Sequence, residues 1–290
     1  MRHIKHPGPL AQQRSTVVDV GIEAVSLRLP AGRSLLDALA DALADALGDH
    51  EACSAVLTLH RGAFHPFSFV MPALSSSPDH AVYFSGRHDP EGEATLAGGC
   101  ITFGRRGDAP WLHCHALWNE ADGRQGCGHV LPNDALISAS VEASAWLMRG
   151  ADFAVLPDAE TNFSLFQPVQ SGALPAAAQA MPALAVRIAP NEDLCTAIEE
   201  ICARRGIREA VLRGGVGSLV GAVFDDGRRV DPFVTEVFIE RGVVSQGNDG
   251  QLRADIDIHL VDHTGPIAQG RLQRGANAVL VTFELIIQPQ

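Results

Sequence analysis

The sequence predicts an α+β fold with two domains, each a mostly antiparallel sheet flanked by a helix. Three observations lead to this prediction. The chain has 290 residues, and a typical domain takes about 150. Hydrophobic residues make up 46% of the chain and charged residues 19%, which is typical of globular proteins rather than disordered or fibrous ones. The two halves of the chain also repeat one order of predicted elements.

The first half begins with a strand, a helix and a second strand. Residues 25–29 alternate between apolar and polar side chains, as a half-buried strand does. Residues 30–34 offer a helix start, and residues 35–47 have the apolar spacing of an amphipathic helix. Three aspartates lie about one turn apart on this helix: Asp37, Asp41 and Asp45. Because like charges repel, we expect their face to lie in solvent. Residues 55–57 form the next apolar strand.

The second half repeats this order. Residues 184–188 alternate like a strand, and residues 190–193 offer a helix start. The following helix has its apolar residues at helical spacing from Leu194 and ends at Gly206. Residues 210–212 form an apolar strand that leads into a glycine-rich segment. This segment lacks the spacing of a phosphate-binding or dinucleotide-binding loop, so we expect tight backbone packing there.

The rest of each half is strand-like, and the two halves align there without a gap. Turns are predicted at Asp122-Gly123 and Thr264-Gly265, and aligning these turns also aligns Glu142 with Glu284. We therefore predict one domain over residues 16–156 and a second over residues 183–290. Residues 157–182, rich in Ala, Gln, Ser and Pro, are predicted to be the linker.

The balance of acidic and basic residues indicates whether the chain can bind nucleic acid. The chain has 22 basic and 34 acidic residues, a net charge of −12. Proteins that bind the phosphate backbone use clustered Lys and Arg, and this sequence has no run of four such residues. We therefore do not expect nucleic acid as a partner.

The cysteines and the N-terminus indicate the cellular compartment in which we expect the protein. The six cysteines occur without a secretory signal, so we expect reduced thiols rather than a disulfide framework. The N-terminus has no apolar signal core, and no stretch of 18 apolar residues occurs. We expect a cytoplasmic protein that does not enter the membrane.

A group of histidines in the first half has the spacing of a metal site. His113 and His115 stand two apart on a predicted strand, where alternate side chains share a face, so Cys114 should point away. A hairpin around Asp122-Gly123 would bring His129 opposite this pair. The sequence thus predicts three imidazoles that converge from two neighbouring strands.

Three histidine ligands leave one tetrahedral position open, which is the catalytic rather than the structural pattern for zinc. Zinc is the expected metal, ahead of nickel, manganese or iron. An alternative is that the three rings are solvated or hydrogen-bonded without a metal. Cys127 is a weaker candidate for a fourth ligand or a nucleophile, because we expect it on the face of its strand opposite to His129.

The second half has different residues at these positions. Asp255, Asp257 and Arg271 stand where the first half has its three histidines. Two carboxylates and a guanidinium can satisfy one another as ion pairs. Our hypothesis is that the second half has replaced the metal with a salt bridge and keeps a structural role.

Three further residues are candidates for catalysis. Arg61 is a candidate clamp for a substrate carboxylate, and His65 a candidate general acid or base. Glu142, a carboxylate among apolar neighbours, could orient a metal-bound histidine or carry a proton. The alternative is that Arg61 and His65 are ordinary loop residues and that Glu142 is structural, since Glu284 recurs without the histidines.

The pattern around the histidines resembles the plants-and-prokaryotes conserved domain, known as the PPC or PCC domain. The shared features are a His-x-His strand, an Asp-Gly turn, a Gly-x-Gly-His strand and a later Glu in an apolar strand. The resemblance covers about residues 18–155, with the histidines, and 182–288, with the histidines replaced. The family's metal histidines match His113, His115 and His129 position by position.

The resemblance implies an α+β domain that assembles into homotrimers with the metal site near subunit contacts. The plant members carry AT-hooks, and the family is usually described as DNA-binding. This chain departs from the pattern: it has Cys127-Gly128-His129 where members usually have Gly-Gly-His, and it has no Arg-Gly-Arg-Pro hook. The missing hook and the acidic balance argue against DNA binding.

These observations lead to one main hypothesis and two alternatives. The main hypothesis is metal-assisted hydrolysis or lyase chemistry on a small anionic metabolite, with His113, His115 and His129 as metal ligands and Arg61 as the anion partner. The first alternative is a non-catalytic, DNA-associated regulator or oligomeric binding module. The second is that both domains only build a trimer.

Overall fold

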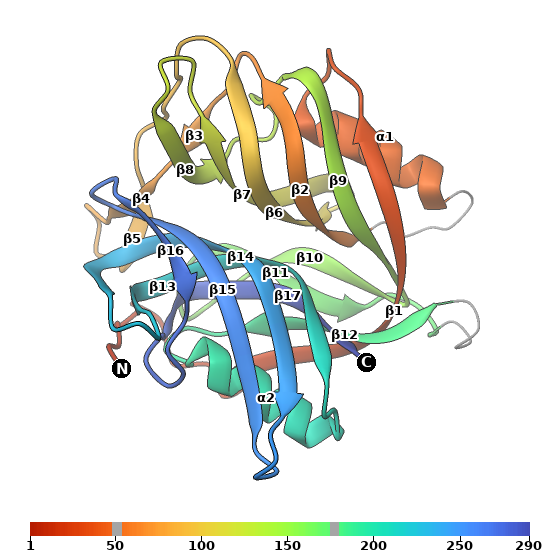
Figure 1. Ribbon diagram of the computed structural model, residues 1–290, viewed down its shortest axis with the longest axis vertical. Coiled ribbons are helices and arrows are strands. Elements are labelled where there is room, and N and C mark those ends of the chain that lie inside the picture. The colour runs from red at the N-terminus through yellow and green to blue at the C-terminus, as the bar shows by residue number, and fades with distance from the viewer. Residues whose placement is uncertain (48–53, 175–179) are drawn as a thin grey trace.

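The protein is described by a computed structural model that covers residues 1–47, 54–174 and 180–290. Within these residues the structure has two helices, α1 (Leu35–Leu47) and α2 (Leu194–Arg205). Figure 1 shows two curved layers of strands, one from each half of the chain, with α2 on the side of the second layer that faces away from the first. The fold is therefore a mostly antiparallel sheet protein with a helix in each half.

The strands fall into two sets that follow the two halves. The first half contains β1 (Ser15–Leu29), β2 (Ala55–Phe64), β3 (Phe69–Val70), β4 (Pro72–Leu74), β5 (Val82–Phe84), β6 (Ala94–Arg106), β7 (Ala109–Asn119), β8 (Gln125–Val130), β9 (Ile137–Arg149), β10 (Ala151–Pro157) and β11 (Ser164–Gln170). The second half contains β12 (Met181–Ile188), β13 (Ala210–Val223), β14 (Arg229–Gln246), β15 (Leu252–Asp262), β16 (Ile267–Arg271) and β17 (Val279–Pro289).

The two halves have the same strand order. The first half runs β1-β9-β2-β6-β7-β8 across its sheet, and the second half runs β12-β17-β13-β14-β15-β16. Strands β1 and β12 pair antiparallel, from Ser15 opposite Ile188 to Ile22 opposite Met181, and so join the halves into one continuous sheet. The β4–β5 hairpin forms a small separate sheet.

Each helix forms where the sequence predicts it. The amide of Asp37 donates to the Ser34 hydroxyl at 3.1 Å, and the Asp193 carboxylate accepts from the Thr196 amide at 2.9 Å; both are N-terminal caps. Gly206, with φ 68°, ends α2 in the left-handed conformation that suits glycine. The three α1 aspartates are exposed, as predicted.

Separate apolar clusters fill each half, and further clusters join them. In the first half α1 packs on the outer face of the sheet through Leu35, Leu39 and Leu43. Between the halves, one cluster brings Leu117 and Cys127 against Val216, Phe238 and other apolar residues. The two layers also approach closely at the glycine-rich segment, because a Cβ on Gly214 would lie 2.7 Å from the Cβ of Val56 in the first half. The expected tight backbone packing at this glycine-rich segment is confirmed.

The segment predicted as a linker has regular structure of its own. Residues Ser164–Gln170 form β11, which pairs along β10, and Phe166 is buried between the halves. The hairpin thus covers one side of the space between the two layers. The domain boundaries themselves stay a prediction.

Two expectations about the whole chain can be compared with the structure. The five cysteines of the described segments are free and buried, in agreement with reduced thiols, and Cys53 lies outside these segments. Neither α1 nor α2, the helices of the described part, is long and apolar enough to span a membrane.

Candidate metal centre

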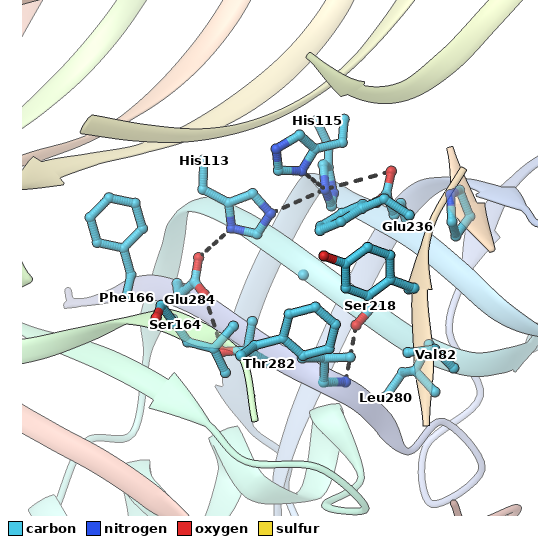
Figure 2. A pocket seen from close by; sticks show the side chains of 18 of the residues that line it. Val82, His113, His115, Ser164, Phe166, Ser218, Glu236, Leu280, Thr282 and Glu284 are labelled. Atoms are coloured by element: carbon cyan, nitrogen blue, oxygen red, sulfur yellow. Dashed lines mark hydrogen bonds and ion pairs between the residues drawn. The ribbon is translucent and has the colours of Figure 1, made fainter. Parts of the chain in front are cut away.

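A cavity of about 290 Å³ lies between the two halves, and the three predicted histidines line it. The first half contributes β5, β7, β8 and the β10–β11 hairpin, and the second half contributes β13, β14 and β17. Figure 2 shows His113 and His115 hanging from the upper layer towards Glu284 and Glu236 of the lower layer. The candidate site is therefore built from both halves of the chain.

The histidines converge as their spacing predicts. His115 lies directly opposite His129 in the β7–β8 ladder, while Cys114 points into the core on the other face. His113 Nε2 lies 3.1 Å from His115 Nε2, and His129 Nδ1 lies 3.3 Å from the same atom. Two nitrogens bound to one tetrahedral zinc at about 2.0–2.1 Å stand about 3.4 Å apart. The observed separations are close to this value.

The second half fixes the orientation of two of the rings. His113 Nδ1 donates to Oε2 of Glu284 at 2.7 Å, and His115 Nδ1 donates to the carbonyl oxygen of Val237 at 2.9 Å. When both rings are neutral and carry their proton on Nδ1, both Nε2 atoms present lone pairs, 3.1 Å apart. Two lone pairs at this distance repel unless a proton or a metal ion lies between them, so the neutral form of this donor set suits a metal ion.

Burial keeps these histidines in the form that a metal needs. Burial lowers the pKa of His115 well below its ordinary value, and a proton on His113 or His129 lowers it further. Burial likewise lowers the pKa of His129 to about 3. Metal ligands must be neutral imidazoles, so both rings are in the binding form near pH 7.

Glu236 is a further carboxyl group at the site. Its side chain comes from β14 and is nine-tenths buried, and burial raises its pKa well above the ordinary value. Oε2 lies 3.9 Å from His115 Nε2 and accepts no hydrogen bond from any of the described residues. This oxygen is therefore available to a group that enters the cavity.

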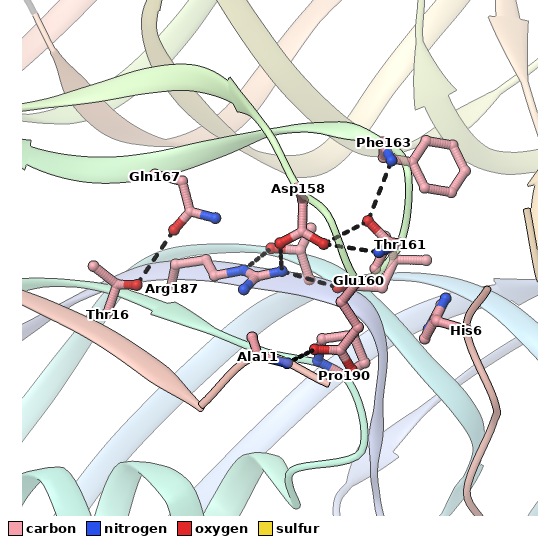
Figure 3. A network of polar contacts seen from close by, with 12 residues as sticks. His6, Ala11, Thr16, Asp158, Glu160, Thr161, Phe163, Gln167, Arg187 and Pro190 are labelled. Carbon is pink, nitrogen blue, oxygen red and sulfur yellow. Dashed lines mark hydrogen bonds and ion pairs between the residues drawn. The ribbon is translucent and has the colours of Figure 1, made fainter. Parts of the chain in front are cut away.

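A buried polar network around Arg187 and Asp158 (Figure 3) connects to the site through Glu284. Glu284 accepts from the Thr282 hydroxyl at 3.1 Å, and Thr282 accepts from Arg187 Nε at 3.2 Å. Arg187 also donates to Asp158 at 3.1 Å. Asp158 in turn accepts from the amide and hydroxyl of Thr161 at 2.9 and 2.8 Å, and so holds the turn that carries Phe163. One network thus supports both His113 and a wall of the cavity.

The other predicted site residues lie elsewhere. Arg61 pairs with Glu142 at 2.7 Å across β2 and β9, and Arg61 is largely exposed. His65 donates from Nδ1 to the Gly92 carbonyl oxygen at 2.8 Å in a loop after β2. None of the three lines the cavity with the histidines. Glu284, the counterpart of Glu142, is the residue that orients a histidine.

The second half has a salt bridge at the equivalent position. Asp257 lies opposite Arg271 in the β15–β16 ladder, as His115 lies opposite His129. Arg271 Nε donates to Asp257 at 3.1 Å, and Asp255 is exposed. The predicted ion pair between Asp257 and Arg271 is present.

The expectation for Cys127 was wrong. It stands two residues before His129, and residues two apart on a strand share a face. Cys127 therefore faces the second half, where it packs against Val216 and Phe238. Burial raises the pKa of its thiol far above the ordinary value, so it is an inert apolar residue here.

Sequence reasoning missed the residues that the second half supplies, namely Glu236, the Val237 carbonyl and the role of Glu284. One signal was available. The alignment of Glu284 with Glu142 marked a carboxylate that recurs within an apolar strand. The sequence could not show which of the two glutamates faces the histidines, because that depends on how the halves pack.

A sequence comparison finds a family match in the second half. Residues 176–289 match the sequence model of the Plants and Prokaryotes Conserved (PCC) domain. No match was found among curated proteins.

Solved structures of low sequence identity resemble about half of the chain. A plant- and prokaryote-conserved (PPC) protein from Pyrococcus horikoshii is 13% identical, with a TM-score of 0.40, over 52% of this chain and 96% of that one. A metal-containing protein from Archaeoglobus fulgidus is 18% identical, with a TM-score of 0.39, over 51% and 94%. A protein from Bacteroides thetaiotaomicron, described as a candidate for DNA binding, is 11% identical, with a TM-score of 0.37, over 51% and 96%.

Proposed function

We propose that the chain is a tandem PCC protein whose first half binds one zinc ion through His113, His115 and His129. The observation that carries this proposal is the pair of Nε2 atoms, 3.1 Å apart, on two rings whose Nδ1 atoms both contact acceptors of the second half. In the neutral rings the lone pairs of these two atoms repel, and a metal ion between them turns this repulsion into coordination. Glu284 and the Val237 carbonyl serve as the outer partners that hold ligating histidines in place.

The shared strand order of the two halves supports the tandem arrangement. The Asp257–Arg271 pair supports a second copy that has lost the metal site, because a guanidinium replaces the charge that the metal would supply. The proposal therefore assigns one metal to each chain.

The proposed activity is metal-assisted hydrolysis or lyase chemistry on a small molecule held in the cavity. Three histidines leave a tetrahedral position for water or substrate, and bound zinc acts there as a Lewis acid or lowers the pKa of water. The cavity between the halves gives a small molecule access to the histidines. Arg61 does not line this cavity, so the preference for an anion is not part of the proposal.

Titration with cobalt(II) tests the metal site. Metal-free protein should develop the strong visible bands of four-coordinate cobalt at one equivalent, and the variant His113→Ala/His115→Ala should not. The control variant His60→Ala/His65→Ala changes two histidines outside the cavity and should bind cobalt normally. Absence of the bands in the wild-type protein, or their persistence in the first variant, would rule out the proposed ligands.

A further inference from the structure

The mouth of the cavity is lined by aromatic side chains that are exposed to solvent. Tyr83 and Phe84 come from the β4–β5 hairpin and are 49% and 39% exposed. Phe163 stacks on Tyr83 at 5.8 Å, and Phe84 lies 5.2 Å from the ring of His129. Exposed aromatic rings that converge on a cavity offer flat apolar surfaces to a ligand.

The charge lining the cavity does not favour an anion. Among the described lining residues Arg106 is the one Lys or Arg, and its guanidinium stacks on Trp111 at 3.9 Å. The carboxyl groups of Glu236 and Glu284 both lie in the wall. In the metal-free chain an anionic ligand would therefore meet both of these carboxyl groups, with Arg106 as the one cationic side chain of the described lining.

Most polar groups of the cavity wall already have partners inside the protein. The Ser218 hydroxyl accepts from the Val281 amide at 3.1 Å, and the Thr235 hydroxyl bonds to the backbone of Leu219. Oε2 of Glu236 is the exception, since it is buried beside the histidines and has no partner among the described residues. A ligand group that both donates and accepts hydrogen bonds would satisfy this carboxyl group.

We propose that the cavity binds uncharged aromatic amides of one or two rings. The ring lies against Phe84 and Phe163, and the amide group hydrogen-bonds to Glu236 beside the three histidines. A cavity of about 290 Å³ has room for a ligand of this size. The proposal names the substrate class of the metal site and, in that respect, rests on the proposed function.

The direct test compares two ligands of equal size and shape. Equilibrium dialysis of the metal-free full chain at pH 7.5 measures the Kd of 2-naphthamide and of 2-naphthoate, which differ in charge and in the amide donor. The expected result is that the amide binds at least tenfold more tightly. Equal affinities, tighter binding of the carboxylate or no binding of the amide would overturn the proposal.

Variants then locate the bound ring. Phe163→Ala and Phe84→Ala should each raise the Kd of 2-naphthamide at least fivefold. Phe233→Ala removes an equally exposed ring that does not line the cavity, and it should leave the Kd unchanged. Unchanged affinity in both of the first two variants would also overturn the proposal.

The two proposals can fail separately. Dialysis without metal reports only on the cavity, whereas cobalt titration of the same preparation reports only on the histidines. If cobalt binds and the amide does not, the substrate class is wrong and the metal site stands. If the amide binds and cobalt does not, the cavity selects its ligand without the proposed metal.

Discussion

At the scale of single residues, the alternation of side chains on β7 and β8 was enough to predict that His113, His115 and His129 meet. Their partners could not be predicted, because Glu284 and Val237 belong to strands more than 100 residues away, and packing of the halves decides which residues face the rings. For the same reason the sequence made Glu142, at the equivalent position of the first half, an equally good candidate for the carboxylate that orients a histidine.

The two glutamates provide a matched test of the outer partner. Glu284→Ala removes the acceptor that orients His113 and should weaken zinc binding by about 10- to 100-fold. Glu142→Ala removes the counterpart that pairs with exposed Arg61 and should leave zinc affinity unchanged. Competition with a chelator of known affinity measures both constants, and equal losses in the two variants would contradict the assignment.

At the scale of elements, α1 and α2 were predicted closely because their caps and apolar spacing are local features. The first part of β1, from Ser15, was missed because its pairing with β12 is a tertiary contact. The short strands of the β4–β5 hairpin, and β11 inside the predicted linker, were missed because their sequences carry no clear period. Of these missed elements, the β4–β5 hairpin and β11 line the cavity.

Asp193, the N-terminal cap of α2, also holds a loop outside the helix. Asp193 accepts hydrogen bonds from the amides of Thr196, Gly275 and Asn277, so it ties the helix to the loop before β17. Asp193→Ala should lower the free energy of unfolding by about 2 kcal/mol, the upper end for a lost cap. Asp37→Ala, at an exposed position of α1, should lower it by about 0.5 kcal/mol or less. Urea unfolding measures both values, and equal effects would argue against this role.

The N-terminal segment should make stability depend on pH. His6 Nε2 donates to the Leu280 carbonyl oxygen, its Nδ1 is buried without a partner among the described residues, and burial lowers its pKa below 6.5. The unfolded chain therefore binds the proton more readily. The contribution of neutral His6 to the free energy of unfolding is fully present above about pH 6.5. It is lost as the pH drops from 6.5 towards the lower pKa of His6 in the folded state.

His6→Gln keeps a donor for Leu280 and removes the titration. The urea midpoint of unfolding is measured at pH 7.5 and at pH 5.5 for both proteins. The decrease in this midpoint from pH 7.5 to pH 5.5 should be smaller in the variant than in the wild-type protein. The same fall in both proteins would show that His6 does not contribute to the acid sensitivity.

At the scale of the whole molecule, the repeat was visible in the sequence, but the way the halves join was not. The β1–β12 ladder and the apolar clusters between the layers make one continuous structure. We therefore predict a single unfolding transition in calorimetry of the metal-free chain, with calorimetric and van't Hoff enthalpies in a ratio of about 1. Two resolved transitions would show that the halves unfold independently. The homotrimer implied by the family resemblance stays a prediction.

The central claim is one zinc site per chain, built by the first half and oriented by the second. Elemental analysis combined with X-ray absorption at the zinc edge tests it most directly. The account predicts one zinc per chain with three imidazole ligands in the wild-type protein. Two zinc ions per chain, no zinc, or a sulfur ligand in the first shell would contradict it.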